Sequence, residues 1–222
     1  MLGFLNNVFV RLQRFGQGIP RGASYVYNKV ASKLLEQFHE KVANEVSLYL
    51  SNGRILDIGC GTGKLLLNIL GKKKVLGVGL DISKAMINIA KVNLSKVYGY
   101  VDLVLGDAHY LPFKSHVFSL IVSTGTLHHI REPHHVFEEC VRVLKFGGEA
   151  WIYEFSYDTP SEELDKTSIE FKKNKYLLRL ASALHGLPRK AYQIGYIKQA
   201  LESSRVRYKI LYNGLVTKLI LS

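Results

Sequence analysis

The residues best suited to chemistry form a glycine-rich loop that directly follows an apolar run. Residues 56–64 read LDIGCGTGK, which places Asp57 before three alternating glycines. Glycines in such a loop accept positive φ angles and let a ligand approach the backbone closely. Two more acids, Asp81 and Asp107, follow the next two apolar runs. If these runs are parallel strands, the acids lie together at the carboxyl ends of the strands, where a carboxylate can accept hydrogen bonds from ribose hydroxyls.

Three nucleotide-binding patterns compete for this loop. The phosphate-binding P-loop needs a glycine at position 58 and a serine or threonine at position 65, but Ile58 and Leu65 stand there. The dinucleotide-binding fingerprint, Gly-x-Gly-x-x-Gly, has its first two glycines at positions 59 and 61. Lys64 stands in place of its third glycine, which weakens the match to this pattern. The pattern Asp-x-Gly-x-Gly-x-Gly fits without a gap. A tight turn stays open for the loop alone, and a turn or cap role stays open for each aspartate alone.

Alternating apolar runs and helical periods predict the elements that position the loop. Short apolar runs predict strands at residues 54–58, 75–80, 101–105, 118–123 and 149–155. Helices are predicted before the first strand and at 64–70, 84–94 and 136–144, with Gly71 as a C-cap and Ser83 as an N-cap. The runs 205–212 and 215–222 flank an Asn-Gly pair, which is a hairpin signal. Together these elements predict an α/β fold with a mostly parallel sheet.

We expect the chain to divide into an N-terminal cap segment (1–30), a cofactor-binding core (31–155), a lid insert (156–190), and a last crossover helix with the C-terminal hairpin (191–222). The insert should hold helices around 164–173 and 176–185, and the crossover helix should span 192–203. An insert after the fifth strand lies at the carboxyl ends of the strands, where open α/β sheets bind ligands. Residues 1–15 predict an amphipathic helix, which either contacts a membrane surface or packs on its own domain or a dimer partner.

Composition excludes several classes of protein. The chain has 222 residues, of which 47% are hydrophobic, and it has only two cysteines, so a disordered chain and a disulfide scaffold are excluded. We expect no membrane span and no signal peptide, and therefore a cytoplasmic location. The net charge of +12 attracts anions such as RNA, anionic lipid or acidic small molecules, although a solvated lysine-rich surface explains it equally.

The motifs resemble those of the class I S-adenosylmethionine-dependent methyltransferases, and most closely the type 11 group that includes ubiquinone/menaquinone biosynthesis methyltransferases. The matching segments lie within residues 54–152: RILDIGCGTGKLL, GLDISKAMINIAK, GDAHYLPF, STGTLHHI and VRVLKFGGEAWI. The resemblance implies a Rossmann-like, doubly wound seven-stranded sheet with a helical lid. It also implies S-adenosylmethionine as cofactor and methyl transfer by in-line displacement to a small or lipid-like molecule. An RNA acceptor (tRNA), a non-catalytic cofactor-binding subunit and a homodimer stay open.

The resemblance also implies which residues contact the cofactor. Asp57 would orient the loop and the amino end of the cofactor, and Asp81 would hold the ribose hydroxyls. Ile82 would pack on the adenine, and Asp107 and Ala108 would bond to it. The full implied set is Tyr27, Asp57, Gly59, Cys60, Gly61, Asp81, Ile82, Asp107, Ala108, Ser123 and Thr124.

Two residues are candidates for a general base, which methyl transfer needs only when the acceptor carries a proton. His128 follows the fourth strand, and Glu154 ends the fifth. Local hydrogen bonding stays open for His128, and pairing with a lid cation stays open for Glu154. No metal-ligand spacing is present, so we expect no metal. Ser119 and Phe146 depart from the type 11 pattern, which has Asp and Pro there, at positions that do not touch the cofactor in that pattern.

Overall fold

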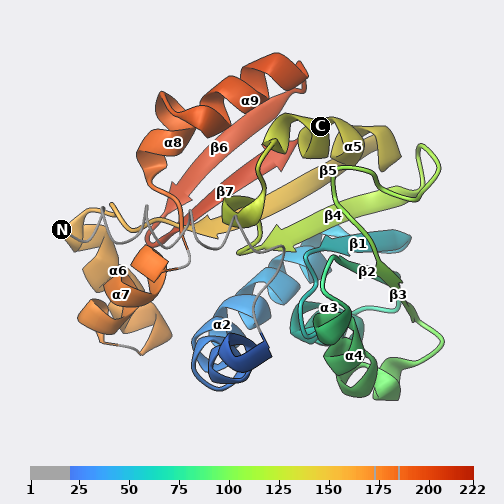
Figure 1. The fold of residues 1–222 in the computed structure, drawn as a ribbon, viewed down its shortest axis with the longest axis horizontal. Coiled ribbons are helices and arrows are strands. Elements are labelled where there is room, and N and C mark those ends of the chain that lie inside the picture. The colour runs from blue at the N-terminus through green and yellow to red at the C-terminus, as the bar shows by residue number, and fades with distance from the viewer. Residues whose placement is uncertain (1–20, 173, 185) are drawn as a thin grey trace.

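A seven-stranded sheet forms the centre of the molecule, with strand order β3-β2-β1-β4-β5-β7-β6 (Figure 1). The computed structural model describes residues 21–172, 174–184 and 186–222, and their side chains from residue 35 on except at 177, 180, 181, 183 and 184. The predicted helix 1–15 lies outside the described residues. Strands β1 to β5 are parallel, whereas β7 runs antiparallel to both β5 and β6. The expected Rossmann-like sheet with an antiparallel C-terminal hairpin is therefore confirmed.

The predicted strands are all present, and the largest difference is that β5 begins at Leu144 rather than at residue 149. The central strands β1, β2 and β4 are buried along most of their length, which explains their continuous apolar runs. The bounds are β1 Arg54–Ile58, β2 Leu76–Asp81, β3 Val101–Leu105, β4 Phe118–Thr124, β5 Leu144–Phe155, β6 Tyr208–Asn213 and β7 Val216–Leu221.

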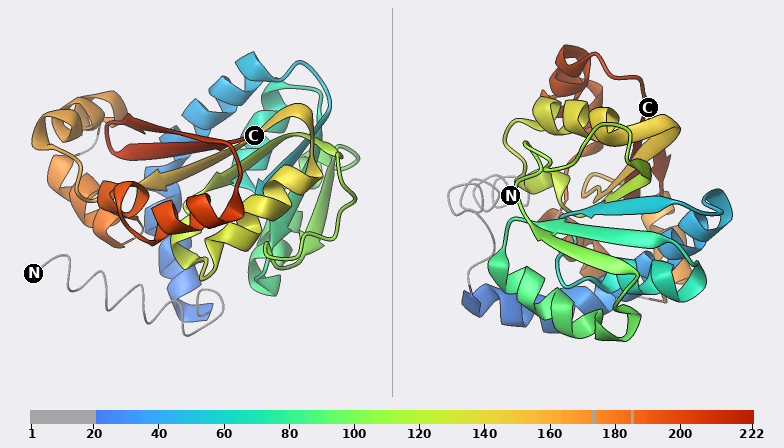
Figure 2. Two further views of the ribbon diagram at one scale, coloured as in Figure 1. Left: turned by 90° about the horizontal axis from the view of Figure 1, so that it is seen from above. Right: turned by 90° about the vertical axis from the view of Figure 1, so that its right-hand side faces the viewer.

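Helices cover both faces of the sheet, and each face has its own hydrophobic core (Figure 2). On one face lie α2 (Arg21–Tyr49), α3 (Lys64–Lys72) and α4 (Lys84–Asn93). On the other lie α5 (Pro133–Val143), α8 (Arg189–Gln193) and α9 (Tyr196–Ser204). Because β1 lies between β2 and β4, the winding direction reverses beside it, which is the position where ligands bind in open α/β sheets.

Two predicted helix features are wrong, and one is confirmed. Gly71 does not cap α3, because the helix continues to Lys72 and its C-cap is Lys73. The crossover helix over 192–203 is not continuous, because α8 and α9 are separate helices on either side of Gly195. A Cβ atom at Gly195 would lie 2.7 Å from the Ala191 Cα, so the chain turns where glycine allows a close approach. Ser83 does cap α4, since its hydroxyl accepts from the Met86 amide at 3.4 Å.

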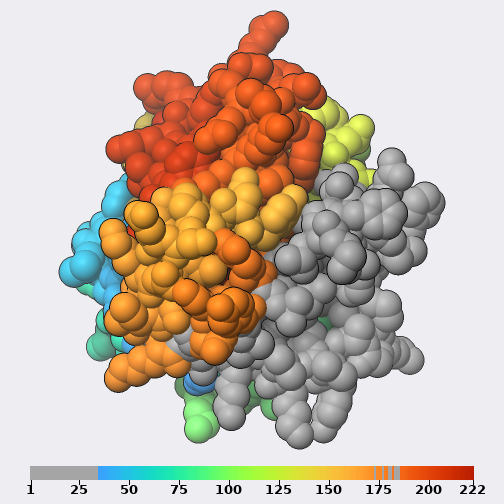
Figure 3. All heavy atoms as spheres, turned by 90° about the vertical axis from the view of Figure 1, so that its left-hand side faces the viewer, coloured from blue at the N-terminus to red at the C-terminus, as the bar shows by residue number. Residues whose placement is uncertain are grey.

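The segment after β5 forms two helices, α6 (Ser161–Phe171) and α7 (Lys175–Leu184), beyond the arrowhead ends of β4 and β5 in Figure 1. Figure 3 shows this segment as part of the outer surface at that end, next to α8 and α9. The Lys41 ammonium bonds to the Glu170 carboxylate at 2.6 Å, which links α2 to α6. Within the described residues, no helix combines the length and apolar character needed to cross a membrane.

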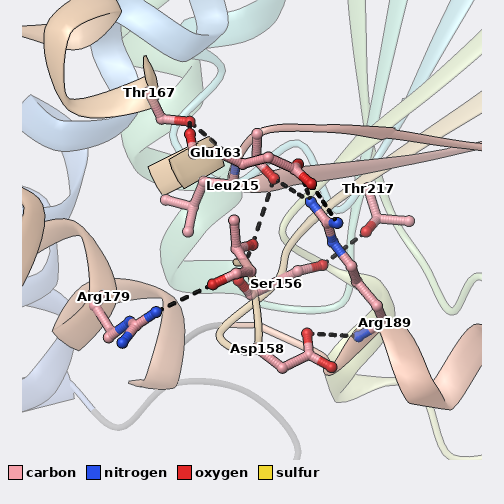
Figure 4. Close-up of polar contacts among 10 residues, drawn as sticks. Ser156, Asp158, Glu163, Thr167, Arg179, Arg189, Leu215 and Thr217 are labelled. Carbon is pink, nitrogen blue, oxygen red and sulfur yellow. Dashed lines mark hydrogen bonds and ion pairs between the residues drawn. The ribbon is translucent and has the colours of Figure 1, made fainter. Parts of the chain in front are cut away.

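A polar cluster fixes α6 and α8 to the turn between β6 and β7 (Figure 4). The Arg189 guanidinium donates to both carboxylate oxygens of Glu163, at 3.1 and 2.6 Å, and to the Gly214 carbonyl at 2.6 Å. The Thr167 hydroxyl donates to the Glu163 carbonyl and accepts from the Leu215 amide. A bidentate arginine–carboxylate pair has a defined geometry, so this cluster sets the orientation of α6 on the hairpin.

Candidate functional site

The glycine loop leaves β1 after Ile58 and leads into α3. The amides of Gly59 and Cys60 both donate to the Leu80 carbonyl, at 2.8 and 3.0 Å, which holds the loop against β2. All three loop glycines have positive φ, a region that other residues rarely adopt. A Cβ atom at Gly59 would collide with the Thr126 hydroxyl, whereas at Gly61 the nearest atom would be 4.0 Å away. The loop therefore packs against protein at Gly59 and is open to a ligand at Gly61.

Asp57 is the most unusual residue of the site. Its side chain is 1% exposed, and neither carboxylate oxygen has a hydrogen-bond partner among the described residues. Burial raises the pKa of Asp57 to about 8, and the nearby charge of Asp81 adds to the shift. Buried polar atoms in folded proteins nearly always have a partner. A carboxyl without one, beneath an open glycine loop, fits a ligand that brings a cationic donor such as an amino group.

Asp81 connects the glycine loop to the end of β2. One oxygen of its carboxylate accepts from the Gly61 amide and the other from the Ser83 amide, both at 2.8 Å. Burial raises the pKa of Asp81, and these two hydrogen bonds counteract the shift in part. Each oxygen keeps a second lone pair, so the carboxylate can still accept from ribose hydroxyls. The adjacent Ile82 is 49% exposed, which offers an apolar surface next to the acid.

Asp107 lies two residues after β3, Asp57 lies within β1, and Asp81 is the last residue of β2, so the three predicted acids lie at the carboxyl ends of three neighbouring strands. Its carboxylate accepts from the His109 amide at 2.9 Å and contacts His109 Nδ1 at 2.6 Å. Partial burial would raise the pKa of Asp107, but the hydrogen bonds and charge of His109 outweigh it and lower the pKa. The next residue, Ala108, is half-buried and packs on the core beneath.

The end of β4 contributes Ser123 and Thr124. The buried Ser123 hydroxyl donates to the Ile58 carbonyl at 2.8 Å, so this side chain joins β4 to β1. Its side chain is thus engaged within the sheet, and its backbone is the part that can line a cofactor. The Thr124 hydroxyl lies 3.4 Å from Nε2 of His39 on α2.

Cys60 and Tyr27 complete the predicted cofactor set. The Cys60 thiol is buried in the core, and burial together with the charges of Asp57 and Asp81 raises its pKa, so it stays protonated. A Cβ atom at Gly79 would lie 2.9 Å from the Cys60 sulfur, so the buried thiol requires a glycine at this position of β2. Cys60 can therefore meet a cofactor only through its backbone. Tyr27 belongs to α2, at a position whose side chain lies outside the described part.

The two predicted base candidates form one buried pair. Glu154 on β5 accepts from the His128 amide at 3.3 Å and lies 3.0 Å from His128 Nδ1, and both side chains are buried. His128 belongs to a short 3₁₀ helix, Leu127–His129, that follows β4. A carboxylate facing Nδ1 favours the tautomer that carries its proton there. Burial raises the pKa of Tyr192 on α8, and the charge of Glu154 adds to it.

His39 is a site residue that the sequence did not single out. It lies on α2, beside Thr124, and burial lowers its pKa to about 4, with a further contribution from the charge of Lys64. The imidazole is therefore neutral at pH 7. Its only signal in the sequence is its place within the helix predicted before the first strand, directly after Phe38.

Comparisons with known proteins agree with this geometry. A family model described as "Methyltransferase domain" (Methyltransf_11) matches residues 56–152. The ubiquinone/menaquinone biosynthesis C-methyltransferase UbiE of Geotalea daltonii is 30% identical over 164 residues, which cover 72% of this chain and 67% of that protein. A ubiquinone biosynthesis O-methyltransferase of Coxiella burnetii is 26% identical, over 56% of this chain and 49% of that protein.

A solved structure shares the whole fold. The SAM-dependent methyltransferase from Aquifex aeolicus superposes with a TM-score of 0.65 at 18% identity, and the match covers 92% of this chain and 98% of that one. The segments that match the family model include the glycine loop and the positions of Asp81 and Asp107. The chain therefore belongs to the type 11 group of the class I S-adenosylmethionine-dependent methyltransferases, and it is an S-adenosylmethionine-dependent methyltransferase.

Proposed function

We propose that this methyltransferase acts on a small, lipid-like acceptor and that its cofactor lies at the carboxyl ends of β1, β2 and β3. The observation that supports this placement most is the buried Asp57 carboxyl, which has no partner beneath the open glycine loop. When bound, S-adenosylmethionine supplies a methyl group on a positively charged sulfur. The protein's task is then to align the acceptor with that group and to exclude water.

The side chains of the site suit distinct parts of the cofactor. Asp57 accepts hydrogen bonds from its amino group, because an ammonium provides the donors that both carboxylate oxygens lack. Asp81 accepts from the ribose hydroxyls with its remaining lone pairs, while its existing bonds hold the loop in place. Ile82 covers one face of the adenine, and Asp107 and the Ala108 amide bond to the adenine edge.

The acceptor side is formed by the ends of β4 and β5 and by the insert. His128 takes the proton that a hydroxyl or an activated carbon acceptor loses, and Glu154 is the positioning residue that keeps the imidazole in one tautomer. The helices α6 and α7 act as the lid that covers the acceptor. The predicted helix 1–15, outside the described residues, brings the enzyme to a membrane surface that carries such acceptors.

The class of acceptor is inferred from relatives. The curated relatives named above belong to ubiquinone or menaquinone biosynthesis, whose products are lipid-like quinones, and they include both a C- and an O-methyltransferase. This favours a lipid-like acceptor over the RNA alternative and leaves carbon and oxygen as acceptor atoms. The two free, buried cysteines favour a reducing compartment, and we place the enzyme in the cytoplasm.

The test uses the purified protein, methyl-labelled S-adenosylmethionine and an extract of the source organism, separated afterwards into lipid, RNA, protein and small-molecule fractions. We expect label in the lipid or small-molecule fraction. Glu154→Gln should reduce the labelling at least roughly tenfold and leave cofactor affinity unchanged, since Glu154 bonds to His128 and to none of the proposed cofactor-binding residues. Glu138→Gln, on the exposed face of α5, is the matched control.

Two outcomes contradict the proposal. Label in RNA would identify the alternative acceptor and overturn the lipid-like one. Cofactor binding without label in any fraction would favour a non-catalytic cofactor-binding subunit.

A further inference from the structure

A cleft lies at the amino ends of the parallel strands, opposite the carboxyl ends where we propose that the cofactor binds. It measures about 490 Å³, and every residue that lines it stands just before a parallel strand or in the first residues of one. It is therefore bounded by the amino ends of β1 to β5, whereas the cofactor site is at the carboxyl ends. The lining residues are Gly53, Arg54, Lys74, Val75, Leu76, Tyr100, His116, Val117 and Lys145.

The residues that line the cleft include cations but no acid. Arg54, Lys74 and Lys145 come from three separate segments of the chain, and all three are among the lining residues. Within the described part of the chain, none of these three cations forms an ion pair. Like charges in one cleft repel each other, and a bound anion relieves this repulsion. The charge pattern therefore fits an anionic ligand.

Aromatic rings lie beside these cations. Tyr100 lines the cleft and is 54% exposed. The Phe146 ring is 92% exposed and stacks on the His116 ring at 4.6 Å, with 18° between the ring planes. His116 holds a left-handed φ of 60° and is anchored by its ring Nδ1, which donates to the Leu144 carbonyl at 3.0 Å. Rings kept at the surface in a fixed orientation can stack on a planar ligand.

Both departures from the type 11 sequence pattern fall beside this cleft. Ser119 replaces the usual Asp, and its hydroxyl lies so close to Gly53 that a side chain at 53 would collide with it. An acid at 119 would thus stand next to the lining. Phe146 replaces the usual Pro and supplies the exposed ring that stacks on His116. One departure removes a negative charge and the other adds an aromatic surface, and neither change serves the cofactor site.

We propose that this cleft binds a nucleoside phosphate, with its phosphates between Arg54, Lys74 and Lys145 and its base against Tyr100 or the His116–Phe146 stack. The volume is within the range of small-ligand sites, and it suits one nucleotide rather than a folded partner. The inference is independent of the acceptor proposed above, because the two sites lie at opposite ends of the parallel strands.

The test is calorimetric titration of the protein with ADP in the presence of saturating S-adenosylhomocysteine, which keeps the nucleotide out of the cofactor site. We expect saturable binding of ADP, with adenosine and inorganic phosphate each binding more weakly. Arg54→Gln and Lys74→Gln should each weaken ADP binding by roughly tenfold, because each removes a charge-assisted hydrogen bond to phosphate. Phe146→Ala should weaken ADP but leave pyrophosphate unchanged.

Matched controls separate this site from general charge effects. Lys91→Gln removes one exposed cation from α4, outside the cleft, and should leave ADP binding unchanged. Affinity for S-adenosylhomocysteine reports that each variant is folded. The proposal is overturned if saturating S-adenosylhomocysteine abolishes ADP binding, if the cleft variants bind ADP like Lys91→Gln, or if an oligoribonucleotide binds where ADP does not, which would indicate an RNA surface.

Discussion

Replacing Asp57 with asparagine should stabilise the protein and weaken its cofactor binding at the same time. The Asp57 carboxyl is buried, and neither oxygen has a partner among the described residues. Burial raises its pKa to about 8 from an ordinary value of 3.8. Asparagine has nearly the same shape and cannot ionise. The substitution therefore removes the free-energy cost of keeping this carboxyl protonated above its ordinary pKa, and it also removes the acid that we propose as the acceptor for the amino group of the cofactor.

The direction of the pH effect follows from where the proton is bound. Between pH 3.8 and about 8, the folded state binds a proton on Asp57 that the unfolded state has lost. The free energy of unfolding therefore falls as pH rises through this window, and the loss levels off above pH 8. At pH 7 the distance from the ordinary pKa is about three units, at about 1.4 kcal/mol each, so Asp57→Asn should gain about 4 kcal/mol over the wild type.

Urea unfolding without cofactor, at pH 5 and pH 7, measures this difference. The gain from Asp57→Asn should be about 1–2 kcal/mol at pH 5 and about 4 kcal/mol at pH 7. Titration calorimetry at pH 7 should show S-adenosylmethionine bound at least roughly tenfold more weakly by the variant. Asp102→Asn, at an exposed position on β3, should change neither quantity. Parallel stability profiles across pH, or unchanged cofactor affinity, would refute the reasoning.

Two further predictions concern Asp81 and Gly214. Asp81→Ala should weaken S-adenosylmethionine binding at least roughly tenfold by calorimetry, because it removes the acceptor of the Gly61 amide as well as the proposed ribose contact. Asp102→Ala is the control. If the two variants bind S-adenosylmethionine equally well, Asp81 has no role in binding the cofactor. Gly214→Ala should lower the free energy of unfolding by about 2 kcal/mol or more, because φ is 56° and the new Cβ would collide with the Thr167 hydroxyl. Gly147→Ala, at φ 77° with no atom within 4 Å, should lose less in the same denaturant titration, and equal losses would exclude the collision as a cause.

Much of the fold could be predicted because its determinants are local. The central strands β1, β2 and β4 are short, mainly apolar runs, since both faces of the sheet are covered by helices. The errors occurred where a backbone contact within a few residues, rather than an apolar pattern, decides where a helix ends. The break between α8 and α9 depends on how closely Gly195 approaches Ala191, and the extension of α3 past Gly71 depends on which residues cap it. Neither feature produces a periodic pattern of apolar residues from which it could have been predicted.

The site was predictable in its positions but less so in its contacts. The spacing of the acids indicated one sheet edge, because the order of a doubly wound sheet brings successive strand ends together. His128 and Glu154 were separate candidates, and only the pairing of β4 with β5 shows that they bond to each other. His39 comes from a helix that precedes the sheet, so its approach to Thr124 has no local signal. The cations that line the cleft at the amino ends of the strands likewise come from separate segments of the chain, so the sequence alone does not bring them together.

The two ends of the segment that follows β5 meet. Phe155 and Gly186 form a β-bridge, and the Leu187 amide donates to the Phe155 carbonyl at 2.8 Å. The chain between Phe155 and Gly186 therefore leaves the sheet and returns to it at the end of β5. Lengthening a segment whose two ends already meet adds little to the entropic cost of closing it, about 0.6 kcal/mol for each doubling of a flexible loop. Because we propose that this part of the chain covers the acceptor, acceptor choice can change with its length and sequence while the strands at the proposed cofactor site stay unchanged.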